Sequence, residues 1–132
     1  MQLFNIKDIA KFDNENPDEP YSEVAPGGYV KHRVINNEKC CLTIACFRDG
    51  QGPAPEAGLH SHPDADEVYL IVEGEALTVD EDGNEHIVGA GNFAYYKAGE
   101  RHNTGAAPGK NCVAYRLQIG KRSTTRHPPE DK

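Results

Sequence analysis

The sequence predicts an all-β protein, and two observations support this fold class. Among 132 residues there are 13 glycines and 9 prolines, and only 37% of the residues are hydrophobic. Gly and Pro favour turns and interrupt helices, so this composition suits a turn-rich β protein better than a helical one. Residues 112–119 also show the clean alternation of a strand. The length is typical of one domain with one core, and we expect residues 1–132 to form a single domain.

The N-terminal part is expected to form an arm over residues 1–27, ahead of the main sheet. Residues 1–12 suit a short strand or a turn of helix. Residues 13–28 contain five acids, three prolines and two glycines, which is typical of an irregular arm or loop. Residues 29–35 place aromatic and β-branched residues at both ends of a basic centre, and we interpret them as the first strand.

Five further strands are expected in the middle of the chain, at residues 40–47, 67–72, 75–80, 85–88 and 93–96. The Asn-Asn-Glu sequence at 36–38 supplies a turn. The sequence at 80–84 supplies a hairpin turn in which Gly83 or Asn84 takes a positive φ. Residues 49–57, with two Gly and two Pro, form a loop.

Residues 112–119 form the last expected strand, and their alternation assigns them to two faces. One face holds Val113, Tyr115, Leu117 and Ile119, and the other holds Ala114, Arg116 and Gln118. Residues 121–132 are polar, with adjacent prolines and several charges, which predicts a mobile tail. The folded core is therefore expected to cover about residues 28–120.

The strand at 67–72 makes a prediction about assembly. If Glu67 points inward, Tyr69 and Ile71 do so too. The outward set is then Val68, Leu70 and Val72. Three apolar residues on an outer face need a cover, which the N-terminal arm or a second subunit can supply. We predict a homodimer on this basis.

The net charge and the cysteines of the chain indicate which kinds of partner it can bind and in which cellular compartment it is expected. The net charge of -7 argues against broad nucleic-acid or acidic-membrane binding, because phosphate contacts need clustered Lys and Arg. No apolar run approaches a membrane span, and no signal peptide is expected at the N-terminus, so we predict a cytoplasmic location. Free thiols are then expected for Cys40, Cys41, Cys46 and Cys112. Cys46 is interpreted as a packing residue.

The residues between Gly58 and Gly74 include most of the candidate metal ligands. His60 and His62 are two apart, so on a strand their imidazoles point to the same side. Glu67 opens an apolar run, where a carboxylate is costly to bury unless it is paired or bound to a metal. A distant third imidazole, His102, completes a nitrogen and oxygen set that suits a divalent transition metal. The alternative is a surface His pair with a solvated Glu.

These residues resemble the cupin superfamily, whose two motifs read G(x5)HxH(x3–4)E(x6)G and G(x5)PxG(x2)H(x3)N. The first motif is matched by His60, His62, Glu67 and Gly74, and the second by Gly91, Gly99 and His102. Three positions depart from the motifs: Ala54 replaces the opening Gly, Lys97 replaces Pro, and Ala106 replaces Asn. Because none of the three is a ligand position, the departures leave the metal site of the family intact.

The resemblance implies a double-stranded β-helix barrel, of the jelly-roll type, with a metal site of three histidines and one glutamate. Carried onto this sequence, the ligands are His60, His62, Glu67 and His102. The ion is one divalent transition metal, and Fe, Mn, Ni, Co and Zn all suit this ligand set. Zinc in a purely structural role is disfavoured, because structural zinc sites are usually closed and rich in Cys.

Cupins include dioxygenases, decarboxylases, isomerases, epimerases, lyases and non-catalytic binders, so the fold alone does not identify the function. We expect a metalloenzyme that acts on a small oxygenated organic substrate by dioxygenase, isomerase or decarboxylase chemistry. The alternative is a non-catalytic module that binds a metal or a small ligand.

Candidates for the substrate pocket come from residues outside the motifs. Tyrosine hydroxyls are available at Tyr69, Tyr95, Tyr96 and Tyr115, of which Tyr69, Tyr95 and Tyr115 are our pocket candidates. Cationic groups that could meet an anion are His32, Arg33, Arg101 and Arg116. For each, the alternative is a core aromatic residue or a surface charge. His86 and His127 are expected at the surface, and no general acid or base is assigned.

Overall fold

A computed structural model describes residues 1–10, 12–13, 21–52 and 58–127 of the chain. Strands dominate these residues, which confirms the predicted all-β class. The elements are α1 (Ile6–Ile9), β1 (Tyr21–Val24), β2 (Val30–Asn36), β3 (Cys40–Phe47), β4 (Leu59–Ser61), β5 (Ala65–Val79), β6 (Glu85–Gly89), β7 (Phe93–Tyr96), β8 (Asn103–Ala106), β9 (Cys112–Gly120) and β10 (Thr125–His127). In the described part of the chain, no helix has the length and apolar character to cross a membrane.

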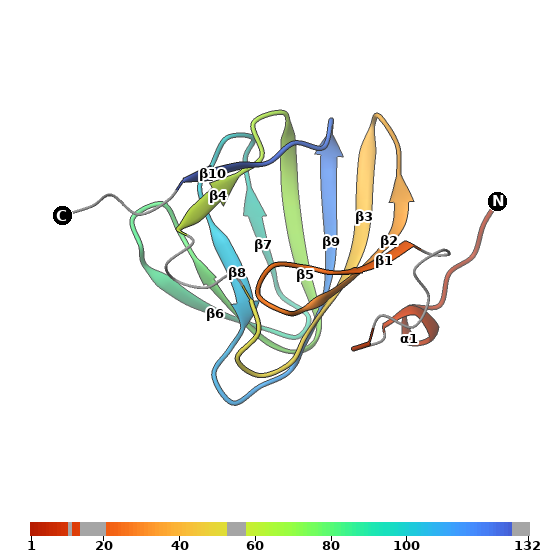
Figure 1. The fold of residues 1–132 in the computed structure, drawn as a ribbon, viewed down its shortest axis with the longest axis horizontal. Coiled ribbons are helices and arrows are strands. Elements are labelled where there is room, and N and C mark those ends of the chain that lie inside the picture. The colour runs from red at the N-terminus through yellow and green to blue at the C-terminus, as the bar shows by residue number, and fades with distance from the viewer. Residues whose placement is uncertain (11, 14–20, 53–57, 128–132) are drawn as a thin grey trace.

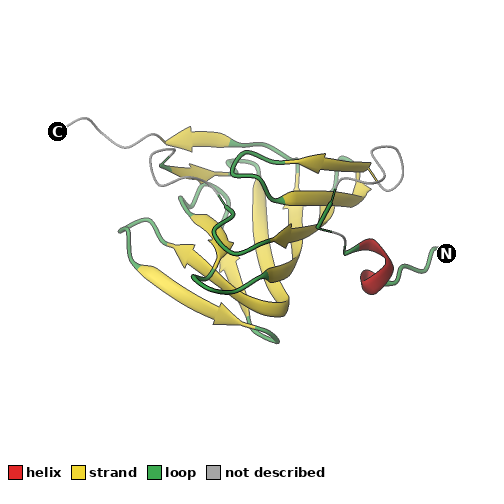
Figure 2. Ribbon diagram, turned by 60° about the horizontal axis from the view of Figure 1, so that its bottom comes forward, coloured by secondary structure: helices red, strands yellow, loops and turns green. Residues whose placement is uncertain are grey.

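The main sheet has the order β1-β2-β3-β9-β5-β6, and β7 and β8 also pair with β5 (Figure 1). Neighbouring strands in this sheet run antiparallel. A separate two-stranded sheet joins β10 to β4. The strands lie on two sides of a common interior, with α1 at the periphery (Figure 2).

The longest strand, β5, links the two sides of the barrel. Its first half pairs with β7 and β9, and its second half pairs with β6 and β8. The sequence predicted two strands here, at 67–72 and 75–80, but the structure has one strand over Ala65–Val79. The register shifts between Ile71 and Glu73, and Gly74 has φ of 74°, so the expected break is a bulge that bends one strand.

The other strand predictions differ from the structure mainly at the two ends of the chain. Residues 40–47 and 93–96 are strands as predicted, and Gly83 supplies the positive φ of the hairpin. Residues 21–24 form β1, although the loop prediction for 13–28 included them. The predicted mobile tail at 121–132 includes β10, so ordered structure continues to His127. Residues 14–20 and 128–132 of these segments, and 53–57 of the predicted loop, lie outside the described part of the chain.

Two apolar clusters pack on opposite faces of the sheet. The inner cluster contains Phe47, which stacks on Tyr29 with ring centroids 4.2 Å apart, together with Tyr69 and Ile71. This confirms the predicted inward direction of the odd-numbered residues of β5. The outer cluster contains Ile44, Cys46 and Val113, with Ile6, Ile9, Val72 and Tyr115 packed against it. Residues of the N-terminal arm therefore pack against the same cluster as Val72, one of the three outward residues.

The four cysteines are free, and three of them pack in the interior. Burial raises the pKa of both the Cys46 and the Cys112 thiols to about 12. Such thiols remain protonated at neutral pH and behave as small apolar side chains. The packing role predicted for Cys46 is confirmed by its complete burial in the outer cluster.

The bulge in β5 depends on Gly74, so we predict that Gly74→Ala strongly destabilises the fold. A Cβ atom at this position would lie 1.8 Å from the carbonyl oxygen of Asn111, a backbone atom that cannot move aside. Gly83 also has a positive φ but has no atom within 4 Å of such a Cβ. We expect Gly83→Ala to cost about 1 kcal/mol and Gly74→Ala at least about 3 kcal/mol in urea unfolding. Equal losses would contradict the steric argument.

Candidate metal centre

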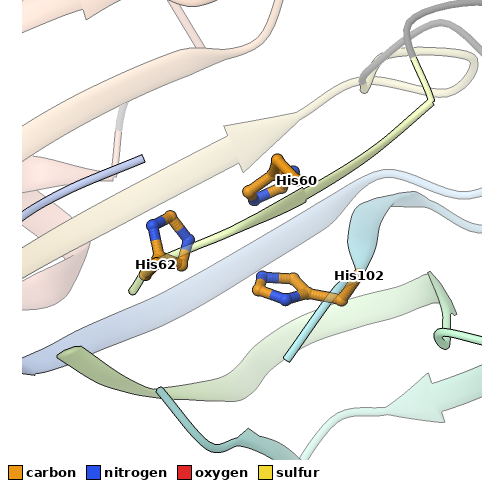
Figure 3. Close-up of side chains that lie close together, drawn as sticks. All are labelled: His60, His62 and His102. Carbon is orange, nitrogen blue, oxygen red and sulfur yellow. The ribbon is translucent and has the colours of Figure 1, made fainter. Parts of the chain in front are cut away.

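Backbone pairing brings His60, His62 and His102 together. His60 lies on β4, and His62 follows one residue beyond that strand. The His60 N–H donates to the carbonyl of His102 at 3.0 Å, and the His102 N–H donates back at 2.8 Å. One ligand atom from each of the three imidazoles lies within 4.8 Å of the other two. Figure 3 shows the three rings turned toward one another from two separate segments.

Glu67 lies beside two of the three imidazoles, on the inner face of β5. Its Oε2 is 2.6 Å from Nε2 of His62, and its Oε1 is 3.4 Å from Nε2 of His102. The Gln118 amide of β9 also donates to Oε2, at 3.0 Å. Burial pushes the pKa of this carboxyl upward, but the imidazole contacts and the nearby Arg116 charge outweigh it and hold the pKa well below its usual value. Glu67 is therefore ionised although it is only 1% exposed.

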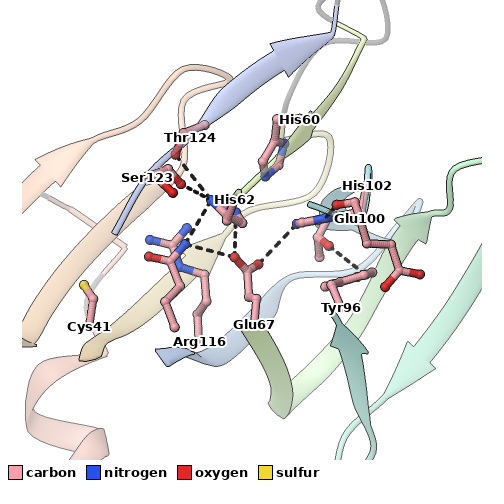
Figure 4. Close-up of polar contacts among 12 residues, drawn as sticks. Cys41, His60, His62, Glu67, Tyr96, Glu100, His102, Arg116, Ser123 and Thr124 are labelled. Atoms are coloured by element: carbon pink, nitrogen blue, oxygen red, sulfur yellow. Dashed lines mark hydrogen bonds and ion pairs between the residues drawn. The ribbon is translucent and has the colours of Figure 1, made fainter. Parts of the chain in front are cut away.

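The outward nitrogens of two imidazoles are held by backbone carbonyls. His62 Nδ1 lies 2.7 Å from the carbonyl oxygen of Ser123, and His102 Nδ1 lies 3.0 Å from that of Glu100. A carbonyl oxygen only accepts, so each Nδ1 carries the proton and donates it. In the neutral imidazole, the proton-free Nε2 then points toward Glu67 (Figure 4).

An amide orients the third imidazole. His60 Nδ1 lies 2.8 Å from Oδ1 of Asn103, the first residue of β8. The Asn103 side-chain nitrogen donates to the Gly58 carbonyl, which fixes the direction of the amide. His60 Nδ1 is therefore the donor here as well. Burial and the neighbouring His102 lower the pKa of His60 to about 4, so at neutral pH the ring is uncharged, as a metal ligand must be.

The convergence of acceptor atoms shows that these residues fit a metal ion. His62 Nε2, His102 Nε2 and Glu67 Oε1 are buried, and among the described residues no hydrogen bond satisfies them. An unprotonated imidazole nitrogen repels a carboxylate oxygen at close range, so either a proton or a metal ion must lie between each Nε2 and the Glu67 carboxylate. A divalent ion fills that position and accepts all the inward lone pairs at once. The set predicted from sequence, His60, His62, Glu67 and His102, is therefore chemically suited to such an ion.

Two residues support the imidazoles in ways that the sequence did not indicate: Tyr96 was named there only for its hydroxyl, and Asn103 was not assigned a role. Tyr96 of β7 stacks on His102, with ring centroids 3.9 Å apart and an interplanar angle of 6°. Its hydroxyl contacts Thr78 and Thr104, which hold the ring in place. Asn103 follows His102 directly, and strand alternation turns it to the opposite side, but its side chain reaches His60 on the neighbouring segment. Strand alternation assigns faces within one strand and does not reveal contacts across strands.

The three tyrosines predicted to line a pocket lie in different places. Tyr69 faces the interior and is 4% exposed. Tyr95 is 50% exposed, and Tyr115 packs into the outer cluster against the N-terminal arm. Both therefore lie on the outer face, because they alternate with the inward residues Tyr96 and Arg116. The pocket prediction is corrected for these two positions.

The cationic and histidine residues that the sequence offered as candidates also lie in different places, some buried and some exposed. Arg116 is buried on the inner face, where its neighbour Tyr69 hydrogen-bonds to it. His32 is buried and lies 2.7 Å from the Ser22 hydroxyl. Arg101 is exposed, and His86 is exposed in a contact of 2.8 Å with Asp80, as expected for a surface histidine.

The segment after Gly120 is part of the centre, contrary to the prediction of a mobile tail. β10 pairs with β4, the strand that carries His60. His127 was expected in solvent, but its Nε2 lies 2.8 Å from the Ser61 hydroxyl. The Ser123 carbonyl accepts from His62. The C-terminal segment therefore pairs with the strand that carries His60 and contacts His62, which follows that strand.

Comparison with known proteins agrees with this geometry. A family model described as "Cupin domain" matches residues 51–118, which is more than half of the chain, and the chain therefore belongs to the cupin superfamily. No match was found among curated proteins. Solved structures of similar fold are numerous, and their low sequence identities show likeness of fold alone.

Three of these structures illustrate the range. A Klebsiella pneumoniae protein described as having a double-stranded β-helix domain is 15% identical, with a TM-score of 0.74, over 98% of this chain and 99% of that one. The polyketide cyclase RemF of Streptomyces resistomycificus is 17% identical, with a TM-score of 0.74, over 99% and 88%. The DMSP lyase DddQ of Ruegeria pomeroyi is 22% identical, with a TM-score of 0.60, over 85% and 52%. The predicted double-stranded β-helix is thus confirmed.

Because Ser123 orients His62, we predict that deleting residues 123–132 weakens metal binding by roughly 10–100-fold, the range typical of losing an orienting partner. Deletion of residues 128–132 alone is the matched control, because it keeps β10 and the Ser123 carbonyl. Titration with Co²⁺, followed by its absorption spectrum, measures the affinity, and circular dichroism checks the fold. Equal Co²⁺ affinity in the two deletions would show that the C-terminal segment does not orient the ligand.

Proposed function

We propose that this cupin holds one divalent transition metal through His60, His62, Glu67 and His102, and acts there on a small oxygenated organic substrate. The proposal rests on how the candidate ligand atoms are arranged. Each imidazole has its Nδ1 occupied by an acceptor, and Nε2 of both His62 and His102 faces the buried Glu67 carboxylate. In a site that served stability alone, hydrogen bonds would satisfy the two Nε2 atoms and the carboxylate oxygen that faces them.

The residues of the chain supply positioning and a fixed charge. Four protein ligands leave two positions open on a six-coordinate ion, which when bound can polarise a carbonyl or lower the pKa of water. Gln118 fixes the Glu67 carboxylate, and Tyr96 supports the His102 ring from the side. Glu67 remains ionised at neutral pH and contributes a negative charge to the site. These contacts hold the ligands in place before any substrate arrives.

The class of reaction is the less specific part of the proposal. Dioxygenase, isomerase and decarboxylase chemistry all use an ion with open positions, and Fe, Mn, Ni, Co and Zn all suit the ligands. The relatives of similar fold include proteins named as a cyclase and a lyase, which supports reactions on small molecules as a general role. A non-catalytic module that binds a metal or a small ligand is the alternative.

The wider setting of the protein is proposed from charge and thiol content. Four free cysteines suit a reducing compartment, and we propose the cytoplasm. The net charge of -7 favours small-molecule partners over nucleic acid. We also propose that the chain acts as one domain, because elements from Ile6 to His127 pack around shared clusters or pair in the two sheets.

We predict that the wild-type protein, purified without chelator, contains about one equivalent of a divalent transition metal per chain. His60→Ala and His102→Ala should each lower metal affinity by more than the 10–100-fold typical of losing an orienting partner, because a ligand itself is removed. His86→Ala is the control, since His86 is exposed and contacts Asp80. Elemental analysis measures the content. Full occupancy in His102→Ala would show that the ligand assignment is wrong.

Turnover separates the enzyme from the binding module. Oxygen uptake that depends on both a substrate and the metal identifies an oxygenase, and metal-dependent product formation without oxygen uptake identifies isomerase or decarboxylase chemistry. A ligand-induced rise in melting temperature without any turnover supports the binding module instead.

We also propose a homodimer, in which a second copy covers the outer face of β7, β5 and β9. On this face Val68 lies opposite Tyr95 and Leu117, and Leu70 lies opposite Phe93. Phe93 is 64% exposed and Tyr95 is 50% exposed. The arm residues Ile6 and Ile9 pack with Val72 against the outer cluster, which does not include Val68 or Leu70. A continuous apolar strip across three strands is costly to leave in water and fits a self-complementary contact.

We predict a particle with the mass of two chains in light scattering. Phe93→Glu should reduce it to one chain, because the substitution places a charge at the most exposed large residue of the apolar strip. Ile87→Glu is the control, because Ile87 is also exposed, at 57%, but lies on β6 and not on these three strands. A wild-type protein with the mass of one chain would contradict the dimer.

A further inference from the structure

A buried arginine lies next to the metal centre on the inner face of the barrel. Arg116 of β9 is 7% exposed and lies between Tyr69 of β5 and Thr43 of β3 in the strand register. Its contact with the Thr43 hydroxyl is long, at 3.5 Å, and its Nε has no hydrogen-bond partner in the described part of the chain. A buried guanidinium normally has its donors paired, so this group is only partly satisfied.

Two further cations share the inner face with Arg116. Arg33 of β2 pairs in register with Thr43, and Lys31 lies two residues away on the same side. Both contact a single acid, Glu23 of β1, at 2.5 Å from Arg33 and 3.4 Å from Lys31. Burial, followed by the charge of Arg116, lowers the pKa of Lys31 to about 8. The inner wall therefore brings three cationic side chains together, Arg116, Arg33 and Lys31.

The second interior carboxylate is already engaged. Glu67 contacts two imidazoles and Gln118, and no carboxylate of the described residues forms a salt bridge with Arg116. A divalent ion at the centre would add to the positive charge. Glu67 lies near Arg116, but a divalent ion bound by the same carboxylate would share its charge, so the positive charge on the inner wall would exceed the negative charge and favour an anion that enters from outside the protein.

Register also places the arginine within reach of a molecule bound at the centre. Gln118, which holds Glu67, and Arg116 are two residues apart on the same face of β9, which corresponds to about 7 Å between their Cα atoms. Figure 4 shows Arg116 beside Glu67 and His62. A planar carboxylate matches the fork of donors that a guanidinium presents.

We propose that Arg116, assisted by Lys31, binds a carboxylate of the substrate while other oxygen atoms of the same molecule reach the metal centre. The substrate class is then a small organic acid with a second oxygen function a few bonds from the carboxylate. This inference rests on the proposed function at the metal centre and specifies its substrate class. Arg116 is assigned to binding and specificity, and the chemistry remains with the centre.

The test uses succinate, a small dicarboxylate, and its neutral diamide as probes. Isothermal titration is carried out on the full chain both with Co²⁺ and without metal. We expect the wild type to bind succinate and to bind the diamide at least tenfold more weakly. Arg116→Gln should weaken succinate binding by about 10–100-fold, as expected for lost charge-assisted hydrogen bonds, and Arg116→Lys by less. Arg101→Gln, at an exposed arginine, is the matched control and should bind like the wild type.

Two results of these titrations would contradict the role of Arg116. Unchanged succinate affinity in Arg116→Gln, or equal binding of succinate and the diamide by the wild type, would overturn it. If Arg116→Gln does not fold, Lys31→Gln carries the test on a partly exposed residue, with a several-fold loss expected and no loss counting against the proposal. Absence of Co²⁺ binding by the wild type would refute the proposed metal function, and the metal-free titrations would still decide the role of Arg116.

Discussion

The buried Glu67 carboxylate is the constraint on which the arrangement of the site depends. An ionised group that is 1% exposed needs compensation from every side, and the Gln118 amide, the Arg116 charge and the cation that must lie between the carboxylate and the imidazoles provide it. The carboxylate, these side chains and the imidazoles come from segments that are far apart in the sequence. The strand pairing around β5 and β9 is therefore necessary for the carboxylate to stay charged, and the charge in turn favours a cation between it and the imidazoles.

The orientation of the imidazoles illustrates what sequence can and cannot predict. His60, His62, Glu67 and His102 were predictable because strand periodicity and motif spacing restrict which residue types can meet. Their orienting partners at Ser123 and Glu100 were not, because each contributes a backbone carbonyl that any residue type carries. Asn103 has a distinctive side chain, but its contact with His60 depends on how two segments pair. Nonlocal pairing of this kind leaves no local pattern.

Two of the corrected strand predictions, at β10 and β5, have the same physical origin. The polar composition of residues 121–127 resembles that of a free tail, yet β10 is ordered because β4 supplies its backbone partners. In β5, Gly74 gives the local signal of a break between strands, although the chain continues through a bulge. A glycine with a positive φ suits either outcome, and the packing of Asn111 against it decides which one occurs.

The inner face of β9 is apolar toward one end and polar toward the other, so packing and the candidate site occupy different parts of the same strand. Toward one end, the inner face of β9 carries Cys112 and Ala114, which pack with Phe47 in the inner cluster. Toward the other end the same face carries Arg116 and Gln118, whose contacts are polar. A close-packed apolar end has little freedom to adjust, so it holds the polar end in register. Packing at the apolar end therefore offsets the unfavourable free energy of burying charge at the polar end of the same strands. For this reason a small barrel can contain a site with several buried donors and acceptors that lack hydrogen bonds.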